Sequence, residues 1–188
     1  MIDGVALPTL DAPRVRLRWL AAGDVDALFA VFSDREMMRY WSTPAFRERA
    51  EAEALLVRIH QQFADKLGFQ WGVERKDDGR LLGTCTLFHL DSRNMRAELG
   101  YALASAYWKN GYMREALSAL LDFAFGPMQL RRLEADVDPR NASSLQILEK
   151  LGFSREGLLR ERWNVDGEIQ DTAFLGLLAR EWRAGIVA

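Results

Sequence analysis

The segment 97–137 constrains the fold of this chain more than any other part of it. Residues 97–103 are predicted to form a strand, a loop that contains Gly111 opens a helix, and residues 131–137 alternate between apolar and polar side chains. Two strands joined by a helical crossover lie parallel, with a right-handed connection. The chain is therefore expected to contain a parallel strand pair.

Other strands and helices flank this unit. Strands are expected over residues 14–19, 69–73, 81–89, 155–163 and 168–178. Asp78-Gly79 and Asp166-Gly167 are hairpin turn signals, which favour antiparallel pairing. Helices are expected from Asp24, over 141–151, and after Pro44, where the apolar stripe is Ala54, Leu55, Ile59 and Phe63. With no repeat or linker in view, we expect one α/β (α+β) domain over 1–188, with helices on both faces of a mixed sheet.

Composition excludes several classes of protein. A net charge of −2 argues against binding nucleic acid through a broad basic surface. One cysteine, Cys85, and two histidines provide neither a disulfide nor an obvious metal site. The first residues lack the pattern of a signal peptide, and no apolar run approaches the ~20 residues of a membrane span. A cytoplasmic protein that binds no metal, nucleic acid or membrane is expected.

Two loop-to-helix junctions carry the candidate chemistry. The loop 108–111 opens a helix, so its backbone N–H groups and the positive helix end converge on a point suited to a phosphate or pyrophosphate. An ordinary strand-to-helix turn is the alternative, because the loop is neither a Walker loop nor a G-x-G-x-x-G loop. At the second junction, Asn141 either caps the helix or joins Ser144, on the same face, in a binding site.

These segments resemble the GNAT superfamily of acyl-CoA N-acyltransferases, and within it the ribosomal-protein N-terminal (Rim-type) branch. The matching segments are 98–103, 108–117, 141–153 and 155–161, and the likeness covers about residues 13–183. The resemblance implies a single-domain fold with a twisted, mostly antiparallel sheet of about seven strands. It also implies a bulge in the strand 98–103 and a splayed parallel pair in the centre, with acetyl-CoA as co-substrate in the V-shaped gap.

The resemblance also implies the residues that hold acetyl-CoA. Pantetheine amides would pair with the backbone of Tyr101, Ala102 and Leu103. The pyrophosphate would lie on the amides of Lys109, Asn110, Gly111, Tyr112, Met113 and Arg114. Asn141 would contact the pantetheine arm and Ser144 would lie near the thiol sulfur. Lys150 would approach the nucleotide end, or would be a solvated helix charge.

The chain departs from the family at several positions. The superfamily loop is Gln/Arg-x-x-Gly-x-Gly/Ala, but here Trp108 and Met113 stand at the first and last positions, and Lys109 stands where many relatives have Gly. A positive φ in this loop is expected to be unstrained only at Asn110 or Gly111. The helix 141–151 lacks the tyrosine that serves as general acid in many members, so Ser144 is expected to orient the leaving thiolate.

The remaining predicted residues belong to the acceptor side. Glu98 is the predicted general base, or else it pairs with an arginine. Tyr40 and Trp41 are expected to wall the acceptor pocket, and His89 is predicted to bind substrate or to form a turn. Because Cys85 alternates within a strand, it is expected in the core, and transfer is expected to be direct.

Three functions stay open from the sequence. The first is transfer of acetyl to a protein N-terminus. The second is acetylation of a small amine such as a polyamine, amino acid or aminoglycoside, which an acidic acceptor cleft built from Glu36, Glu48, Glu51 and Glu53 would favour. The third is a non-catalytic acyl-CoA-binding module, since a fold does not fix a function. The expected state is a monomer or a homodimer.

Overall fold

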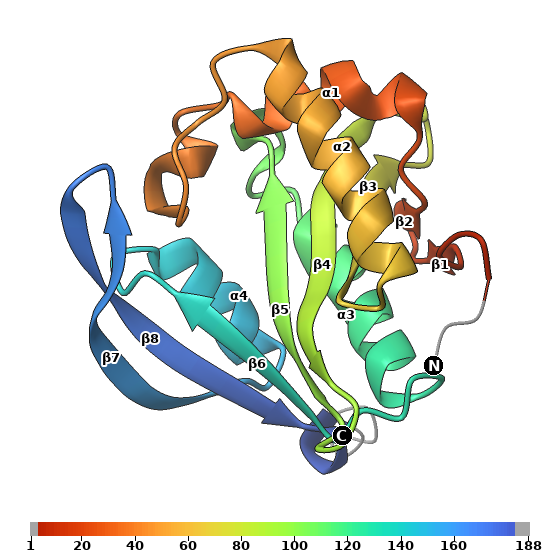
Figure 1. The fold of residues 1–188 in the computed structure, drawn as a ribbon. Helices are drawn as coiled ribbons and strands as arrows, with labels where there is room; N and C mark the ends of the chain where they lie inside the picture. Colours follow the sequence, from red (N-terminus) through yellow and green to blue (C-terminus); the bar gives the residue numbers. More distant parts are fainter. Residues whose placement is uncertain (1–3, 183–188) are drawn as a thin grey trace.

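The computed structural model describes residues 4–182 (Figure 1). The ends of the expected domain, 1–3 and 183–188, lie outside the described residues. The strands are β1 (Leu10–Asp11), β2 (Val15–Arg18), β3 (Gly68–Arg75), β4 (Leu81–Asp91), β5 (Arg96–Leu103), β6 (Arg132–Val137), β7 (Ser154–Val165) and β8 (Glu168–Leu178). The helices are α1 (Val25–Phe32), α2 (Arg49–Ala64), α3 (Tyr112–Phe125) and α4 (Ala142–Lys150), with short 3-10 helices η1 (Ala22–Asp24), η2 (Met37–Tyr40) and η3 (Ser105–Tyr107).

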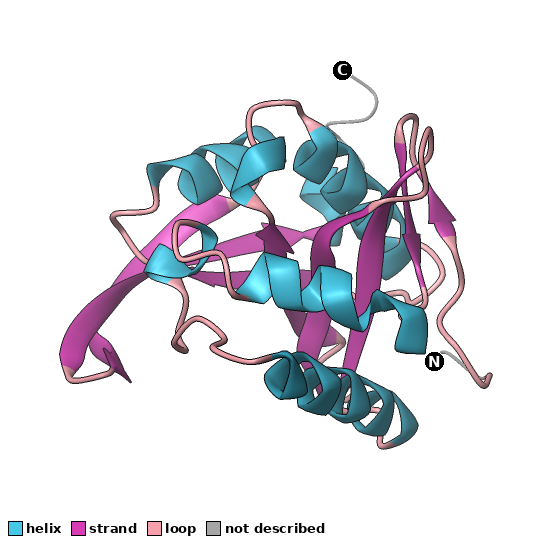
Figure 2. Ribbon diagram, turned by 90° about the horizontal axis from the view of Figure 1, so that it is seen from above, coloured by secondary structure: helices cyan, strands magenta, loops and turns pink. Residues whose placement is uncertain are grey.

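The strands form one mixed sheet in the order β1-β2-β3-β4-β5-β6-β8-β7. Only β5 and β6 are parallel neighbours among the described strands, which confirms the crossover predicted over 97–137. Helices α1 and α2 cover one face, and α3 and α4 cover the other (Figures 1 and 2). The sheet has eight strands where about seven were expected, because the two-residue β1 adds an edge.

The parallel pair is splayed, as the resemblance implied. It pairs only from Arg96 with Arg132 to Glu98 with Glu134. Beyond Glu98, β5 stays paired with β4 as far as Leu103, while β6 stays paired with β8 (Figure 1). The side of β5 that faces β6 therefore has no strand partner past Glu98, and a gap opens in the middle of the sheet.

The prediction of a bulge in β5 is wrong, because the bulge lies in the neighbouring strand β4. The register shifts in β4, between Phe88 and Asp91, so that His89 and Leu90 lie opposite the single residue Ala97. His89 takes a left-handed φ of 48° there. An extra residue on one strand bends that strand and re-aims its side chains. The splay of β5 from β6 thus arises without a bulge on β5.

Two apolar clusters hold the sheet between its helices. One packs α3 and α4 against one face and contains the fully buried Trp71 and Leu133. The other packs α1 and α2 against the opposite face. The predicted stripe of α2 was wrong at Ala54, which is exposed, whereas Ala52 and Leu56 are buried. Positions two residues apart lie on nearly opposite sides of an α-helix, so Ala54 cannot share the face of Ala52. None of the helices within residues 4–182 is both long and apolar enough to cross a bilayer.

Candidate active site

A cavity of about 810 Å³ runs through the gap between β5 and β6. It brings together most of the residues predicted from the sequence, namely Tyr40, Trp41, Glu98, Tyr101, Ala102, Leu103, Lys109, Gly111, Met113, Arg114, Asn141, Ser144 and Lys150. Three predicted residues lie outside its wall: Asn110, Tyr112 and His89. One continuous space therefore joins the loop 108–111, the predicted anion-binding loop (hereafter the anion loop), to the predicted acceptor wall.

The loop before α3 has the geometry of an anion site. Gly111, with a φ of 82°, is the N-cap of α3 and provides no side-chain cap. The N–H groups of the first helical turn have no intrahelical partner. Lys109 and Arg114 add positive charge to the same wall. These features fit a phosphate or pyrophosphate group.

Two details of this loop differ from expectation. Lys109, and not Asn110, takes a left-handed φ of 62°, a conformation that is unfavourable for a side chain of this size. Trp108 has a role that the family pattern did not predict, because its indole N–H donates to the Leu103 carbonyl at 2.7 Å. That hydrogen bond links the loop to the end of β5. The Leu103 carbonyl therefore already accepts a hydrogen bond from within the chain.

Tyr101 reaches across the gap from β5 to α4. Its hydroxyl donates to Ser144 Oγ at 2.9 Å, and it lies 3.3 Å from the Ser144 carbonyl. Burial raises the pKa of Tyr101, so the phenol stays protonated and remains a donor. From the sequence, only the backbone of Tyr101 was predicted to take part in the site. Its alternation with Leu99 and Leu103 could have placed this side chain on the face that α4 covers.

Asn141 has both of the roles that were considered for it. Its Oδ1 accepts the Ser144 N–H at 3.1 Å, so it is the N-cap of α4. It also lines the cavity, together with Ser144. The cap fixes the first turn of α4 and thereby the position of the Ser144 hydroxyl.

Two carboxylates face the gap from neighbouring strands. Glu98 on β5 has a side chain that is 14% exposed, and its Oε2 lies 2.9 Å from His89 Nδ1. The alternative considered for Glu98, a pair with an arginine, is not what the structure gives, because its partner is His89 and the nearby Arg96 binds Asp91 and Glu134. His89 has a side chain that is 71% exposed and reaches the site only through Glu98.

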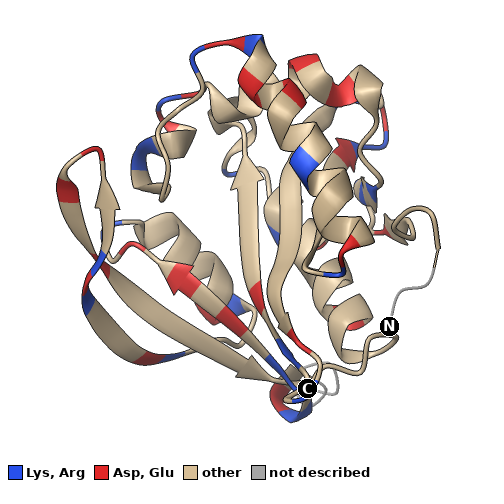
Figure 3. Cartoon of the chain, in the orientation of Figure 1, with Lys and Arg blue, Asp and Glu red and all other residues tan. Residues whose placement is uncertain are grey.

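The second carboxylate, Asp136 on β6, was missed by the sequence analysis. Its Oδ1 accepts hydrogen bonds from the Thr172 hydroxyl at 2.5 Å and from Trp163 Nε1 at 3.2 Å. The sequence contained the information to find Asp136, since the alternation over 131–137 places it on the other face of the strand from the buried Leu133 and Ala135. Figure 3 shows acidic positions, in red, along the ribbon of β6 and a mixture of acidic and basic positions around it.

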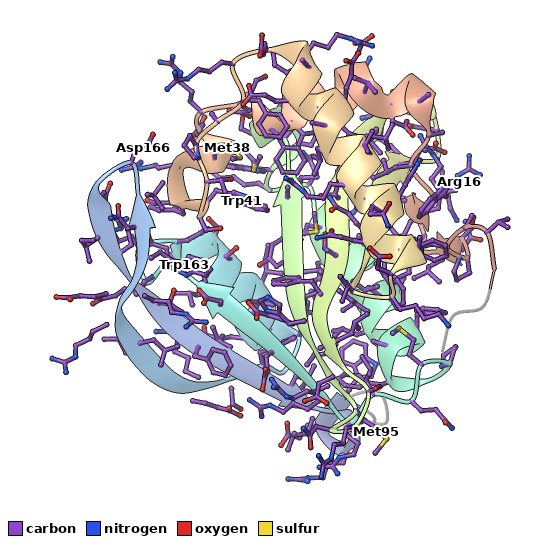
Figure 4. The ribbon with its side chains drawn as sticks, viewed as in Figure 1. Arg16, Met38, Trp41, Met95, Trp163 and Asp166 are labelled. Carbon is purple, nitrogen blue, oxygen red and sulfur yellow. The ribbon has the colours of Figure 1, made fainter. Side chains whose placement is uncertain are left out.

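Aromatic side chains line the end of the cavity that is predicted to hold the acceptor, and Arg39 and Arg58 lie in the same wall. Trp41 comes from the segment after η2 and Trp163 from β7 (Figure 4). The Arg140 guanidinium lies 5.8 Å from the Tyr40 ring centroid and forms ion pairs with Asp138 and Glu168. The guanidinium thus connects three elements around this end.

The acidic acceptor cleft considered from the sequence does not form. Of its four glutamates, only Glu36 lines the cavity. Glu51 accepts the backbone N–H groups before α2, and Glu53 pairs with Arg49 on the surface. Glu48 is exposed.

Cys85 does not belong to the site. It is a free, fully buried thiol whose Sγ lies 3.6 Å from Met113 Sδ. Burial raises the pKa of this thiol, which opposes formation of a nucleophilic thiolate. Over residues 4–182, no cluster of three His, Cys, Asp or Glu side chains could hold a metal ion.

Comparison with known proteins gives one family. Residues 14–154 match the family model described as an acetyltransferase (GNAT) domain. The uncharacterized N-acetyltransferase YoaA of Bacillus subtilis is 33% identical over 165 residues, which are 88% of this chain and 93% of the relative. The solved structure of a GCN5-related N-acetyltransferase from Brucella melitensis superposes with a TM-score of 0.84 at 26% identity, covering 94% of this chain and 81% of the other.

Two further relatives differ in the acceptor that their names give. YdaF of Bacillus subtilis, named "putative ribosomal N-acetyltransferase", is 32% identical over 69% of this chain and 70% of the relative. The spermidine N(1)-acetyltransferase of Escherichia coli K12 is 26% identical over 92% of this chain and 90% of the relative.

Proposed function

This chain belongs to the GNAT acetyltransferase family and is an N-acetyltransferase that uses acetyl-CoA, and we propose that its acceptor is the N-terminal amine of a protein, of the ribosomal-protein type. We also propose that residues 1–188 form one acetyltransferase domain and that the protein works in the cytoplasm. The single observation that carries the proposal is the continuous cavity through the splayed strands.

A continuous cavity supports direct transfer between two bound substrates. The anion loop is proposed to hold the pyrophosphate of acetyl-CoA, and the unpaired side of β5 to hold its pantetheine arm. The thioester would then lie between Glu98 and Ser144. Attack of the amine forms the C–N bond, the amine proton passes to Glu98, and the C–S bond breaks to release the CoA thiolate. Ser144 donates a hydrogen bond to that thiolate.

The charge of the acceptor end favours an acceptor with one ammonium group. Asp136 is bonded to Thr172 and Trp163, Asp138 is paired with Arg140, and Glu98 is bonded to His89. A polyamine carries several positive charges, and each of them would need a carboxylate. Glu36 in the cavity wall could meet one of these charges, but the others would need carboxylates that are already bonded. Arg39 and Arg58 in the cavity wall add positive charge, which opposes binding of a polycation. A protein N-terminus carries a single amine that deprotonates before attack, and the rest of its backbone is neutral.

A thiol-release assay with matched acceptors tests this proposal. The acceptors are peptides with a free N-terminus, the same peptides with a blocked N-terminus and an internal lysine, intact ribosomal proteins, spermidine and an aminoglycoside. Release is expected with free N-termini, and it should be lost when the N-terminus is blocked. Faster turnover of spermidine than of every peptide and protein would contradict the proposal and favour the polyamine function that the Escherichia coli relative has.

The base assignment has its own test. Glu98→Gln is expected to lower kcat by roughly 10²–10⁴-fold, the usual contribution of a general base, with little change in acetyl-CoA affinity. Asp136→Asn, the matched variant on the neighbouring strand, should lower kcat less. If the Asp136 variant loses more activity than the Glu98 variant, the base is Asp136 and Glu98 is structural.

A further inference from the structure

Arg14, in the turn before β2, contacts the outer side of the anion loop, about a hundred residues further along the chain. Its Nη2 donates to the Asn110 carbonyl at 2.8 Å. Its Nε donates to Glu115 Oε1 at 2.6 Å, and its backbone N–H donates to Glu115 Oε2 at 2.9 Å. The guanidinium carbon also lies 4.8 Å from the Tyr112 ring centroid. One side chain therefore contacts the loop, the first turn of α3 and the ring that follows Gly111.

These contacts determine the direction of a loop N–H group. Asn110 C=O and Gly111 N–H belong to the same peptide, and in a trans peptide the two groups point in opposite directions. Because the carbonyl is held by Arg14 on the outer side, the Gly111 N–H points away from Arg14. The large cavity is lined by Gly111, whereas Arg14 is not part of its wall.

Arg14 also neutralises an unfavourable charge. Glu115 lies in the first turn of α3, where its carboxylate would repel a phosphate bound at the helix N-terminus. The ion pair with Arg14 compensates that charge and turns the carboxylate toward β2. This explains how an acidic residue can be tolerated next to an anion site.

We propose that Arg14 is a positioning residue for acetyl-CoA, which shapes the loop amides that bind the pyrophosphate and does not touch the acceptor or the reacting atoms. The inference rests on the pyrophosphate placement in the proposed function. It predicts that loss of Arg14 weakens only those ligands that carry the pyrophosphate.

The test compares a ligand that has the pyrophosphate with one that lacks it. For Arg14→Ala, the Kd of CoA measured by calorimetry is expected to rise about tenfold, while the KM for S-acetylpantetheine and the kcat at saturating acetyl-CoA stay unchanged. Arg14→Lys keeps the charge but cannot bridge Asn110 and Glu115 together, so it should give an intermediate loss. Arg16→Ala is the matched control, because Arg16 pairs with Glu74 on β3, away from the loop, and CoA affinity should be retained.

The outcomes separate the role of Arg14 from the placement of the pyrophosphate. Unchanged CoA affinity in both Arg14 variants overturns the inference. An equal loss for CoA and S-acetylpantetheine also overturns it, because that result indicates a general effect on the fold. If Arg14→Ala fails to fold, Arg14→Lys decides. The proposed placement itself fails separately, if Gly111→Val leaves CoA affinity unchanged.

Discussion

At the scale of single residues, the hydrogen bond between Tyr101 and Ser144 bears most directly on the chemistry. A serine hydroxyl has one hydrogen to donate and two lone pairs. Since the Tyr101 phenol donates to Ser144 Oγ, one lone pair is occupied and the serine hydrogen is left for an acceptor in the cavity. Tyr101 thus orients the Ser144 hydroxyl, which is proposed to donate a hydrogen bond to the leaving thiolate. It does so from β5, whereas α4 itself has no tyrosine.

Removing either partner of this hydrogen bond should have a similar effect. Tyr101→Phe and Ser144→Ala are each expected to lower kcat by roughly 2- to 13-fold, the value of one neutral hydrogen bond of about 0.5–1.5 kcal/mol. The double variant should be no worse than Ser144→Ala, because the two residues act as one unit. Steady-state kinetics of the wild type, the two single variants and the double variant measures the coupling between the two residues. Tyr107→Phe, whose hydroxyl accepts from Arg80 outside the cavity, is the control. Losses that multiply in the double variant would show that the residues act separately.

Cys85 provides the second prediction at this scale. Cys85→Ala should keep kcat near that of the wild type, because burial raises the pKa of the thiol and its Sγ lies beside the thioether of Met113. Intact-mass measurement after incubation with acetyl-CoA alone should detect no acetyl group on Cys85. An acetylated Cys85 that passes its acetyl group to the acceptor amine would refute direct transfer.

At the scale of elements, the junction between β5 and α3 is the part of the chain that is proposed to hold the pyrophosphate of acetyl-CoA. Trp108 bonds back to β5, Lys109 and Gly111 take left-handed conformations, and α3 begins at Tyr112. At Gly111, an added Cβ would lie 3.1 Å from the Arg14 guanidinium in a backbone conformation that side chains rarely adopt. The loop therefore depends on this glycine for both its conformation and its packing.

Gly111→Val is expected to weaken CoA binding at least about tenfold and to cost about 1–2 kcal/mol of stability, the penalty for a side chain in the left-handed region. Gly79→Val is the matched control, since Gly79 has a φ of 70° in the β3–β4 turn and open space around it. It should lose similar stability and keep CoA affinity. Calorimetric titration and urea unfolding separate the two effects. A parallel loss of CoA affinity in the control would show that general destabilisation is the cause.

At the scale of the whole molecule, a buried charge network joins the sheet to the α1–α2 layer. Arg18 on β2 donates to Asp24 at 2.8 Å and pairs with Glu74 on β3. Burial alone would raise the pKa of Asp24 and of Glu74. The hydrogen bonds and charge of Arg18, together with the Ala21 N–H on Asp24 and Arg16 on Glu74, more than offset it, and both pKa values lie below their ordinary range. The carboxylates therefore stabilise the fold in their ionised form.

The sign of the pH dependence follows. Because both pKa values are lowered in the folded state, this stabilisation is fully present above about pH 4–5 and is lost as the pH falls through the lowered values. Arg18→Met should cost about 3–5 kcal/mol at pH 7, since it leaves a buried charge without its partner. The loss should shrink toward pH 4, where Asp24 can protonate. Urea unfolding from pH 3 to 8 measures this, with Arg49→Met as the surface control. A pH-independent loss would contradict the account.

The local pattern of the sequence determined much of the fold. Alternation identified the strands and the face that each residue takes, the βαβ unit required the parallel pair, and Asn141 and Gly152 marked the ends of α4. These features depend on neighbours within about one turn or strand, so they can be predicted without any knowledge of long-range contacts. The β4 bulge escaped prediction because its extra residue is defined only by the opposing strand.

The tertiary structure decided which side chains meet. Glu98 bonds to His89 because the β4 bulge brings them together, Tyr101 reaches Ser144 because α4 packs across the gap, and Arg14 reaches Glu115 from the turn before β2. Periodicity gives the face of each residue but not the register between elements that are distant in sequence. The sequence by itself thus determined the candidate residues and the elements that carry them, whereas their partners depended on the packing of the whole chain.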